Sequence, residues 1–435
     1  MRGRAGKTAK GDKMSDGLRH RLKAAVPLPT ILRKLLQVSR RLWVRIGLVA
    51  SLAVLSLAIA GVVGPLLPEE IPEIVGAEAL VNILEIIASS MLAVTIFSLS
   101  VMVNAHRAVS DQWSPRARQL LLTDGVTMTT LATFLGAWLF ALLGVIVMDT
   151  SYIGEGEVLV LFSVTMLVIG WIVFSIIRWI VHLEDLGSLA HTGARIEAAT
   201  REALELRIGA PCLGGRDVTQ AQIPFDAVPV ETRTSGWVRH IYEDRINEAA
   251  RAAAADVYLT VPIGRYVFEG EVIARVTSPS TELRQAMLDN VTVGEMRSFD
   301  QDPRFGFVVL GEIASKALSP GINDSGTAID AISRAARILA AWSVDEPTDR
   351  PRYERLWAHP IRPADLMGDA FGAPARDGAG QIEVVEFLLR TLAHLERHDA
   401  PAMSVAAREM SALVKSYAGR TLEEPVDLAR LDSAA

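Results

Sequence analysis

The chain has 435 residues, of which 50% are hydrophobic and 22% are charged, and its formal net charge is −6. Its single cysteine, Cys212, excludes an intrachain disulfide and a paired-cysteine zinc or redox site. The long apolar runs lie before residue 183, so the composition excludes a wholly soluble protein and favours a membrane-embedded front half.

A basic segment opens the chain. Its first 45 residues hold thirteen Lys or Arg residues against Asp12 and Asp16, which predicts a cytoplasmic basic arm over residues 1–40.

Four apolar runs follow, each long enough to cross a bilayer as a helix. They cover about residues 42–63, 80–103, 126–148 and 158–181. We therefore expect a transmembrane α-helical domain of four helices over residues 41–182.

The charges of the connectors predict how the helices are oriented across the membrane. Lys and Arg gather in the arm, in the loop between the second and third runs, and after the fourth run, whereas the other two loops are acidic. Positive charge stays on the cytoplasmic side of a membrane, so both termini are expected in the cytoplasm.

The second half of the chain predicts a cytoplasmic α+β domain. Residues 183–228 favour a stalk helix and linker, and residues 229–420 favour a domain with a small β-rich module and paired helices. The expected strands are 236–238, 257–261, 266–268 and 272–276, and the expected helices are 241–255, 302–318, 325–341, 382–397 and 402–418. The Pro- and Gly-rich residues 343–380 predict an irregular excursion, and residues 421–435 predict a disordered tail.

A turn joins the two helices 302–318 and 325–341. Pro320 and Gly321 suit the central positions of a type II turn, and Asn323 or Asp324 suits the N-cap of the following helix. Thr327, with Asp330, offers a second capping arrangement one turn later. The stretch therefore predicts two antiparallel helices joined by a capped turn.

The chain resembles a family of uncharacterised bacterial membrane proteins, domain of unknown function 2254, over roughly residues 40–420. The residues that carry the resemblance are Ser114-Pro115-Arg116 with Asp124, residues 235–238, Gly264 with Gly270, Gln301-Asp302, and the signature loop from Ala317 through Ser319, Pro320, Gly321, Asn323 and Asp324 to Thr327-Ala328. Ser325 stands where the family usually has Pro, and Ser298 where it usually has Thr. The resemblance implies a multi-pass protein of the bacterial inner (plasma) membrane and supplies no reaction.

Polar residues on the second run suggest an ion path. Asn82, Glu85 and Ser89 are spaced to share one helical face, and a carboxylate within a span indicates a partner, a water-filled path or an ion site. Because Glu85 is near the outer end of that run, a position among the lipid headgroups is the competing interpretation. A stripe of small residues on the third run, including Thr133, Ala141 and Gly144, favours close helix packing over a pore lining.

Carboxylates around the signature loop are weak candidates for a divalent-cation site. Asp300, Asp302, Asp324 and Asp330 could supply oxygen ligands, with Glu295 and Glu312, if the fold brings them together. Helix capping is the favoured interpretation of Asp324. The chain has no phosphate-loop or dinucleotide motif and no basic patch with interleaved aromatic residues in its second half, so we expect no cofactor and no nucleic-acid partner.

Two functional hypotheses follow. The favoured one is a homo-oligomeric channel- or transporter-like unit in the lipid bilayer, gated by a cytoplasmic domain that responds to an ion or small ligand. The alternative is a non-transporting membrane anchor whose cytoplasmic domain binds a ligand or protein partner through the loop 319–327. An enzyme that uses the acidic cluster is the third and least favoured class, and it requires Asp302 and Asp324 to lie within a few ångströms of each other.

Overall fold

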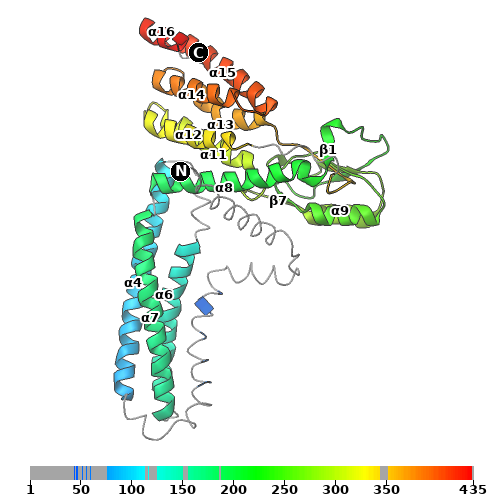
Figure 1. Ribbon diagram of the computed structural model, residues 1–435. Coiled ribbons are helices and arrows are strands. Elements are labelled where there is room, and N and C mark those ends of the chain that lie inside the picture. The colour runs from blue at the N-terminus through cyan, green and yellow to red at the C-terminus, as the bar shows by residue number, and fades with distance from the viewer. Residues whose placement is uncertain are drawn as a thin grey trace, which may run out of the picture. The chain divides into compact units, whose positions relative to one another are not determined.

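The computed structural model describes residues 76–112, 116, 125–149, 155–185, 188–342 and 351–433, together with six single positions between residues 44 and 59. The chain divides into two compact units. The first unit holds residues 1–103 and 124–184, and the second holds residues 104–123 and 185–435 (Figure 1).

The first unit contains three long helices, α4 (Ala77–Gln112), α6 (Gly125–Met148) and α7 (Glu155–Asp185). Each holds a stretch long and apolar enough to cross a membrane, namely Ala77–Ala105, Gly125–Met148 and Val158–Leu183. These stretches coincide with the second, third and fourth predicted spans. The first predicted span, 42–63, lies outside the described residues except for single positions. The described part of the chain thus has three candidate spans, against the four expected.

Helix α6 is the central helix of the first unit. Half of its most apolar stretch is buried, against 17% for α4 and 28% for α7. Its Phe134 and Phe140 are fully buried and form one apolar core with Leu84 of α4 and Leu161 of α7. Figure 1 shows the three helices running side by side. Large apolar side chains on the outer faces of α4 and α7, such as Phe97 and Leu167, are exposed, as expected where lipid replaces water.

The second unit contains a layer of packed helices. They are α8 (Leu189–Gly209), α11 (Pro303–Ala317), α12 (Ser325–Ala340), α13 (Pro363–Asp377), α14 (Ile382–Glu396), α15 (Pro401–Thr421) and α16 (Pro425–Ser433). They begin at residues suited to helix starts: Ser188, Asp302 and Asp324 accept hydrogen bonds from the first turn of α8, α11 and α12, whereas α11, α13 and α15 have Pro in the first turn.

Helix α11 is the centre of this layer because two glycines let its neighbours approach closely. A Cβ on Gly306 would collide with the Thr200 side chain of α8. A Cβ on Gly311 would lie 2.7 Å from the Asp369 carbonyl oxygen of α13. Helix α12 packs along α11, and α14 and α15 complete the same apolar core.

The β-rich module follows α8 in the chain (Figure 1). Its strands are β1 (Arg216–Asp217), β2 (Val228–Glu231), β3 (Gly236–Ile241), β4 (Val257–Leu259), β5 (Tyr266–Val267), β6 (Val272–Val276), β7 (Val291–Gly294) and β8 (Leu356–Ala358). Its helical segments are η3 (Pro211–Gly214), η4 (Val218–Gln220), α9 (Glu243–Ala252) and α10 (Thr281–Asn290).

The strands form two sheets. The five-stranded sheet has the order β1-β8-β4-β6-β2 and the three-stranded sheet the order β5-β3-β7. β8 pairs in parallel with β1 and β4, whereas the other pairs are antiparallel. Strand β8 comes about a hundred residues after β4 in the chain, so it ties the β-rich module to the helical layer that follows it. A separate apolar core, with Ile246, Leu259 and Met287, fills the module.

Four predicted strands and the five predicted helices of the second unit are confirmed, with ends that shift by a few residues. The sequence did not predict β1, β2, β7, β8 or α10. These strands are two to four residues long, too short to show an alternating pattern of their own.

Two predicted irregular regions are wrong. Residues 343–380 contain β8 and the fifteen-residue helix α13, which begins at Pro363 and retains Pro374 near its end. Residues 343–350 lie outside the described residues. In the tail, α15 continues to Thr421 and α16 follows, with Leu431 buried and Arg430 paired with Glu386 of α14.

The predicted stalk and the predicted turn type also require correction. Helix α8 contributes Ile196 and Leu204 to the core with α11 and α12, so it is part of the helical layer. In the turn after α11, Gly321 does not adopt positive φ, which a type II turn requires. The left-handed residue is Asn323 at φ 51°. Its amide donates to the Ser319 carbonyl, and the Asp324 amide donates to the Ala317 carbonyl at the end of α11.

Candidate functional site

The structure separates the acidic residues that were candidates for a metal site. Asp302 caps the N-terminus of α11 and Asp324 caps α12, beyond the C-terminus of α11. The fifteen residues of α11 place the two caps about 22 Å apart along the helix. Within the described residues, no three His, Cys, Asp or Glu side chains are grouped as a metal site requires. An enzyme that uses Asp302 and Asp324 together is therefore ruled out.

Three of the remaining candidate acids have local partners. Asp300 accepts a hydrogen bond from the Ser298 hydroxyl, Asp330 pairs with Arg334, and Glu312 pairs with Arg116. Burial raises the pKa of Asp302, and the bidentate Arg297 guanidinium opposes that rise. These contacts account for the acids as caps and ion pairs.

The signature loop is a capped turn on the surface. The Ser319 hydroxyl donates to the Lys316 carbonyl, and the Asp324 carboxylate accepts from the Thr327 amide and hydroxyl. Asn323 accepts a hydrogen bond from Gln381, which precedes α14. Pro320 and Gly321 are exposed, and neither they nor their neighbours in the loop line a described cavity. The loop orients α11, α12 and α14.

The polar residues of α4 lie on its exposed face. Asn82, Glu85 and Ser89 are exposed, whereas Leu80 and Leu84 on the opposite face are fully buried. The Ser89 hydroxyl donates to the Glu85 carbonyl of its own helix. The three residues share a face as predicted.

The small residues of α6 serve close packing. Ala137, Ala141 and Gly144 are buried, and a Cβ on Gly144 would lie 3.0 Å from the Leu84 side chain. Thr133 accepts a hydrogen bond from the Trp171 indole of α7. This outcome agrees with the packing interpretation of the stripe.

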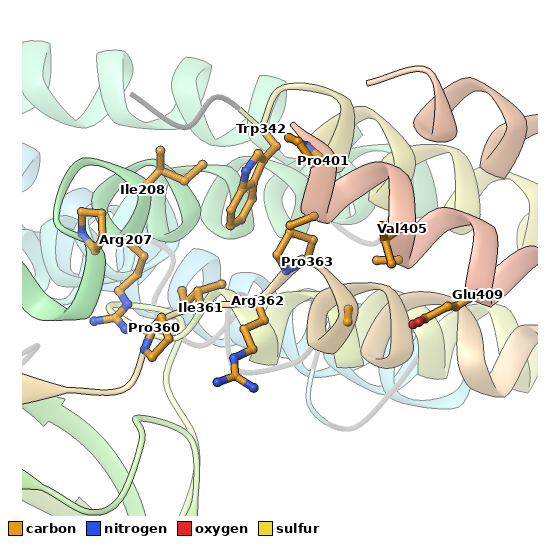
Figure 2. A pocket seen from close by; sticks show the side chains of 14 residues that line it. Arg207, Ile208, Trp342, Pro360, Ile361, Arg362, Pro363, Pro401, Val405 and Glu409 are labelled. Atoms are coloured by element: carbon orange, nitrogen blue, oxygen red, sulfur yellow. The ribbon is translucent and has the colours of Figure 1, made fainter. Parts of the chain in front are cut away.

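Two adjoining cavities lie in the second unit, where α8 ends and the segment between β8 and α13 passes. One, of about 300 Å³, has polar walls that include Thr219, Gln301, Arg304 and His359. The other, of about 580 Å³, has mainly apolar walls that include Ile208, Trp342 and Val405. Arg207 and the run Pro360, Ile361 and Arg362 line both cavities. Figure 2 shows these shared residues grouped at one end of the apolar cavity.

Arg207 is the unusual residue of this site. It lies in the last turn of α8 with a relative exposure of 9%, and its Nη2 donates to the His359 carbonyl at 3.2 Å. Among the described residues, its buried Nη1 has no hydrogen-bond partner, and no carboxylate lies within ion-pair distance of its guanidinium. Burial lowers the pKa of Arg207, and Cys212, Glu243 and Asp302 only partly oppose this shift. The fold thus buries a cation that it leaves incompletely satisfied.

The other charges of the polar cavity are better compensated. Asp302 lines the polar cavity and is paired with Arg297, which does not line it. Arg304 pairs with Asp369 and Asp365, and the hydrogen bond to Asp369 raises its pKa.

Arg362 is the second cation shared by the two cavities. It is exposed, and its Nη2 reaches the Thr219 hydroxyl at 3.5 Å, with no carboxylate among the described residues at ion-pair distance. Arg207 and Arg362 therefore give the shared wall an excess of positive charge.

The residues around Arg207 offer further hydrogen-bonding groups. His359 Nε2 lies 3.2 Å from the Thr260 carbonyl, which accepts, so this nitrogen carries the proton. The Trp342 ring lines the apolar cavity, and its buried N–H has no acceptor among the described residues. Beside the cavities, the described part of the protein thus leaves two donors without an acceptor, the Arg207 Nη1 and the Trp342 indole N–H.

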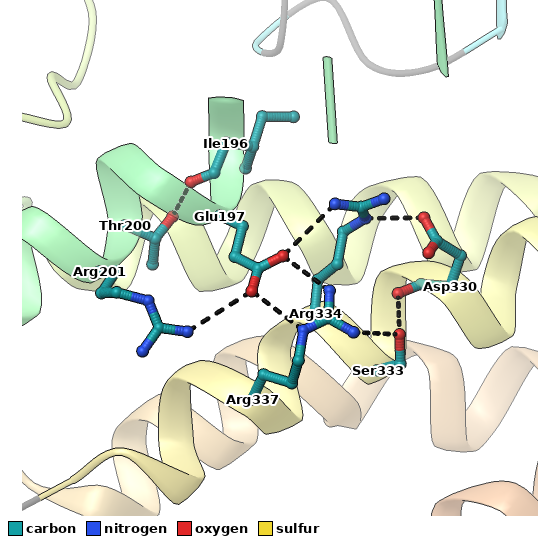
Figure 3. A network of polar contacts seen from close by, with 8 residues as sticks. All are labelled: Ile196, Glu197, Thr200, Arg201, Asp330, Ser333, Arg334 and Arg337. Atoms are coloured by element: carbon teal, nitrogen blue, oxygen red, sulfur yellow. Dashed lines mark hydrogen bonds and ion pairs between the residues drawn. The ribbon is translucent and has the colours of Figure 1, made fainter. Parts of the chain in front are cut away.

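A network of arginines fixes α8 in the helical layer. The Glu197 carboxylate of α8 accepts from Arg337 at 2.7 Å and from Arg334 at 3.3 Å, both on α12. Arg201, one turn later on α8, lies at 3.5 Å, and Arg334 also binds Asp330. Figure 3 shows Glu197 surrounded by the three guanidinium groups. The network holds the helix that carries Arg207.

The sequence contains a signal for Arg207 that our prediction missed. Ile196, Thr200, Ala203 and Arg207 recur every three or four residues on α8, and all four are buried. An arginine that continues a buried stripe must be neutralised or kept for a ligand. The prediction of a solvated stalk hid this pattern, because α8 has charged residues on its other faces.

Comparison with known proteins places the chain among uncharacterised membrane proteins. A family model described as "Predicted membrane protein (DUF2254)" matches residues 39–394. The uncharacterised proteins Mb1321c of Mycobacterium bovis and Rv1290c of Mycobacterium tuberculosis are each 30% identical to this chain over 225 residues. Each alignment covers 49% of this chain and 43% of the relative, so the match spans less than half of those relatives. No solved structure matches the chain.

Proposed function

Because the chain belongs to the DUF2254 family of predicted membrane proteins, we propose that its membrane helices anchor a ligand-binding domain built from residues 189–433. We propose that the ligand is a small anion bound beside Arg207. The observation that carries this proposal is the burial of Arg207, whose Nη1 has no hydrogen-bond partner in the part of the chain that the structure describes.

The energetics of a buried arginine support the proposal. A guanidinium stays protonated in proteins, so it cannot relieve its burial by losing the proton. A buried cation without a partner costs several kcal/mol. A carboxylate or phosphate beside Arg207 would offset this cost with charge-assisted hydrogen bonds. Arg362 on the shared wall would add attraction for the same anion.

Chain connectivity supports a sensing role for the domain. Helix α8 begins at Leu189, four residues after the candidate membrane helix α7 ends at Asp185. Arg207 lies in the last turn of the same α8. A ligand that orders this end of α8 would act on the helix that follows α7 in the chain.

A channel or transporter has weaker support. The small residues of α6 are filled by packing against neighbouring helices. The exposed face with Asn82, Glu85 and Ser89 has no described partner that would make it a path. Transport, homo-oligomerisation and location in the inner membrane remain predictions from the sequence and its resemblance.

The test of the proposed function uses the full chain in lipid nanodiscs with acetate and inorganic phosphate as probes. We expect at least one probe to raise the melting temperature at constant ionic strength, because a ligand that binds only the folded state stabilises it. The variant Arg207→Met should lose this response. Arg284→Met, at an exposed position of α10, is the matched control and should keep it.

The unliganded stability of Arg207→Met separates a ligand site from a structural arginine. Replacing an unpaired buried cation with an apolar side chain is neutral or stabilising, so the variant should melt at the same temperature as the wild type or higher. A markedly lower melting temperature would show that Arg207 supports the fold. A wild type that responds to neither anion would contradict the proposal.

A further inference from the structure

We infer that the ligand is a small monobasic organic acid, with its acid group at Arg207 and Arg362 and its apolar body in the neighbouring cavity. The inference rests on the proposed anion site and adds the chemical class of its ligand. It follows from three features of the second unit: the shared wall of the two cavities, the size of the apolar cavity, and the distribution of charge along it.

The shared wall joins a cationic end to an apolar volume. Arg207 and Arg362 line both cavities, so an acid group held by them is at the mouth of the apolar cavity. That cavity is walled by Ile208, Trp342 and the α15 residues Val405 and Ala406. An inorganic anion would leave these apolar walls in contact with water, whereas an organic acid would cover them.

The volume of the cavities limits the size of the acid. The apolar cavity of about 580 Å³ and the polar cavity of about 300 Å³ are in the range of pockets that enclose small molecules. A single short chain or one or two rings fit this space. A phospholipid with two long acyl chains does not, so we assign the site to a soluble acid.

Charge at the opposite end of the apolar cavity excludes a second acid group. Glu409 of α15 lines the cavity, and Figure 2 shows it at the far end from Arg207. A dicarboxylate of similar length would place its second carboxylate near Glu409, where like charges repel. The arrangement selects a molecule with one acid end and an uncharged body.

Trp342 lies in the wall of the apolar cavity. Its N–H lacks an acceptor among the described residues, and its ring forms part of the wall. A body that covers this ring changes the surroundings of the indole. Binding can therefore be followed by fluorescence, with Trp342→Phe as the assignment control.

The experiment measures the affinity of the full chain in nanodiscs for acetate, butanoate, hexanoate and octanoate, with empty nanodiscs subtracted. We expect the affinity to rise about three- to fourfold for each methylene group that becomes buried. Octanedioate should bind at least tenfold more weakly than octanoate. The substitution Glu409→Gln should narrow that gap.

A variant that fills the apolar cavity provides an independent check. Val405→Trp should abolish the gain in affinity with chain length. Leu413→Trp, at another partly exposed position of α15, is the matched control and should preserve the gain.

The outcomes distinguish this inference from the proposed function. Acetate or phosphate binding through Arg207 without any chain-length dependence would overturn the inference and keep the anion site. Absence of binding by every acid and by phosphate would overturn both. Binding of a short-chain phosphatidic acid, but not of octanoate, would replace the soluble acid with a lipid.

Discussion

Asp302 and Asp324 cap their helices in the same way, but Asp302 is buried and Asp324 is exposed. Asp302 and Asp324 both accept hydrogen bonds from the first turn of their helices, a role that residue spacing alone suggested for Asp324. Asp302 is 3% exposed and also binds Arg297 through two bonds of 2.8 and 3.0 Å. The Arg297 guanidinium lies over the rings of Trp237 and Phe305. Asp302 therefore compensates a cation that joins the β-rich module to α11.

We expect Asp302→Asn to destabilise the protein much more than Asp324→Asn. Asparagine is a good N-cap, so both variants keep a capping oxygen. Only Asp302→Asn leaves a buried guanidinium without its acid, which costs about 3 to 5 kcal/mol. The melting temperature of the full chain should fall by about 6 °C or more for Asp302→Asn. It should change by about 2 °C or less for Asp324→Asn. Similar losses in the two variants would contradict this assignment.

At the scale of elements, the sequence predicted helices with clear periodicity and missed short or interrupted ones. In the pairs α11–α12 and α14–α15, apolar residues recur at helical spacing, and this pattern predicts a helix clearly. Helix α13 was missed because Pro374 and its glycines suggest a loop, although Pro374 is buried in the last turn. Strand β8 was missed because its partners β1 and β4 are distant in sequence.

The candidate site was missed for a related reason. Its walls come from α8, the segment before α11, the segment before α13, and α15. No local pattern brings these four parts of the chain together. Only the buried stripe of α8 that ends at Arg207 carried information about the site. That stripe can be recognised as buried only when α8 is known to pack against other helices.

The contribution of Glu197 to the stability of the α8–α12 contact should depend on pH. Desolvation raises its pKa, but the hydrogen bond and charge of Arg337, with Arg334 and Arg201, outweigh it, so the net pKa is lowered from 4.5. A lowered folded-state pKa means that this contribution is fully present above pH 4.5 and disappears as the pH falls through the folded-state value.

We expect Glu197→Gln to cost about 1 to 3 kcal/mol at pH 7. The difference in melting temperature between this variant and the wild type should shrink toward pH 3. Glu396→Gln, which removes a more exposed pair with Arg408, is the control and should cost less than about 1 kcal/mol at pH 7. A difference for Glu197→Gln that is constant between pH 3 and pH 7 would contradict the electrostatic origin.

At the scale of the whole molecule, the ends of the membrane helices differ in charge. Asp149 directly follows α6, and α7 begins with Glu155 and Glu157. Arg178 lies near the opposite end of the hydrophobic stretch of α7. Because α6 and α7 are joined by a short connector and run in opposite directions (Figure 1), these charges mark opposite ends of the pair. The positive-inside rule then predicts that Asp149 lies outside and the second unit in the cytoplasm.

Labelling of single cysteines tests this orientation. Cys212 is 7% exposed, and burial raises the pKa of its thiol to about 11, so it should react slowly, and Cys212→Ser removes it as background. In that background, Asp149→Cys and Glu423→Cys place thiols at exposed positions of the two units. A membrane-impermeant maleimide should label Asp149→Cys in right-side-out vesicles, and Glu423→Cys only in inverted vesicles or detergent. The reverse pattern would place the second unit, with its proposed anion site, outside the cell.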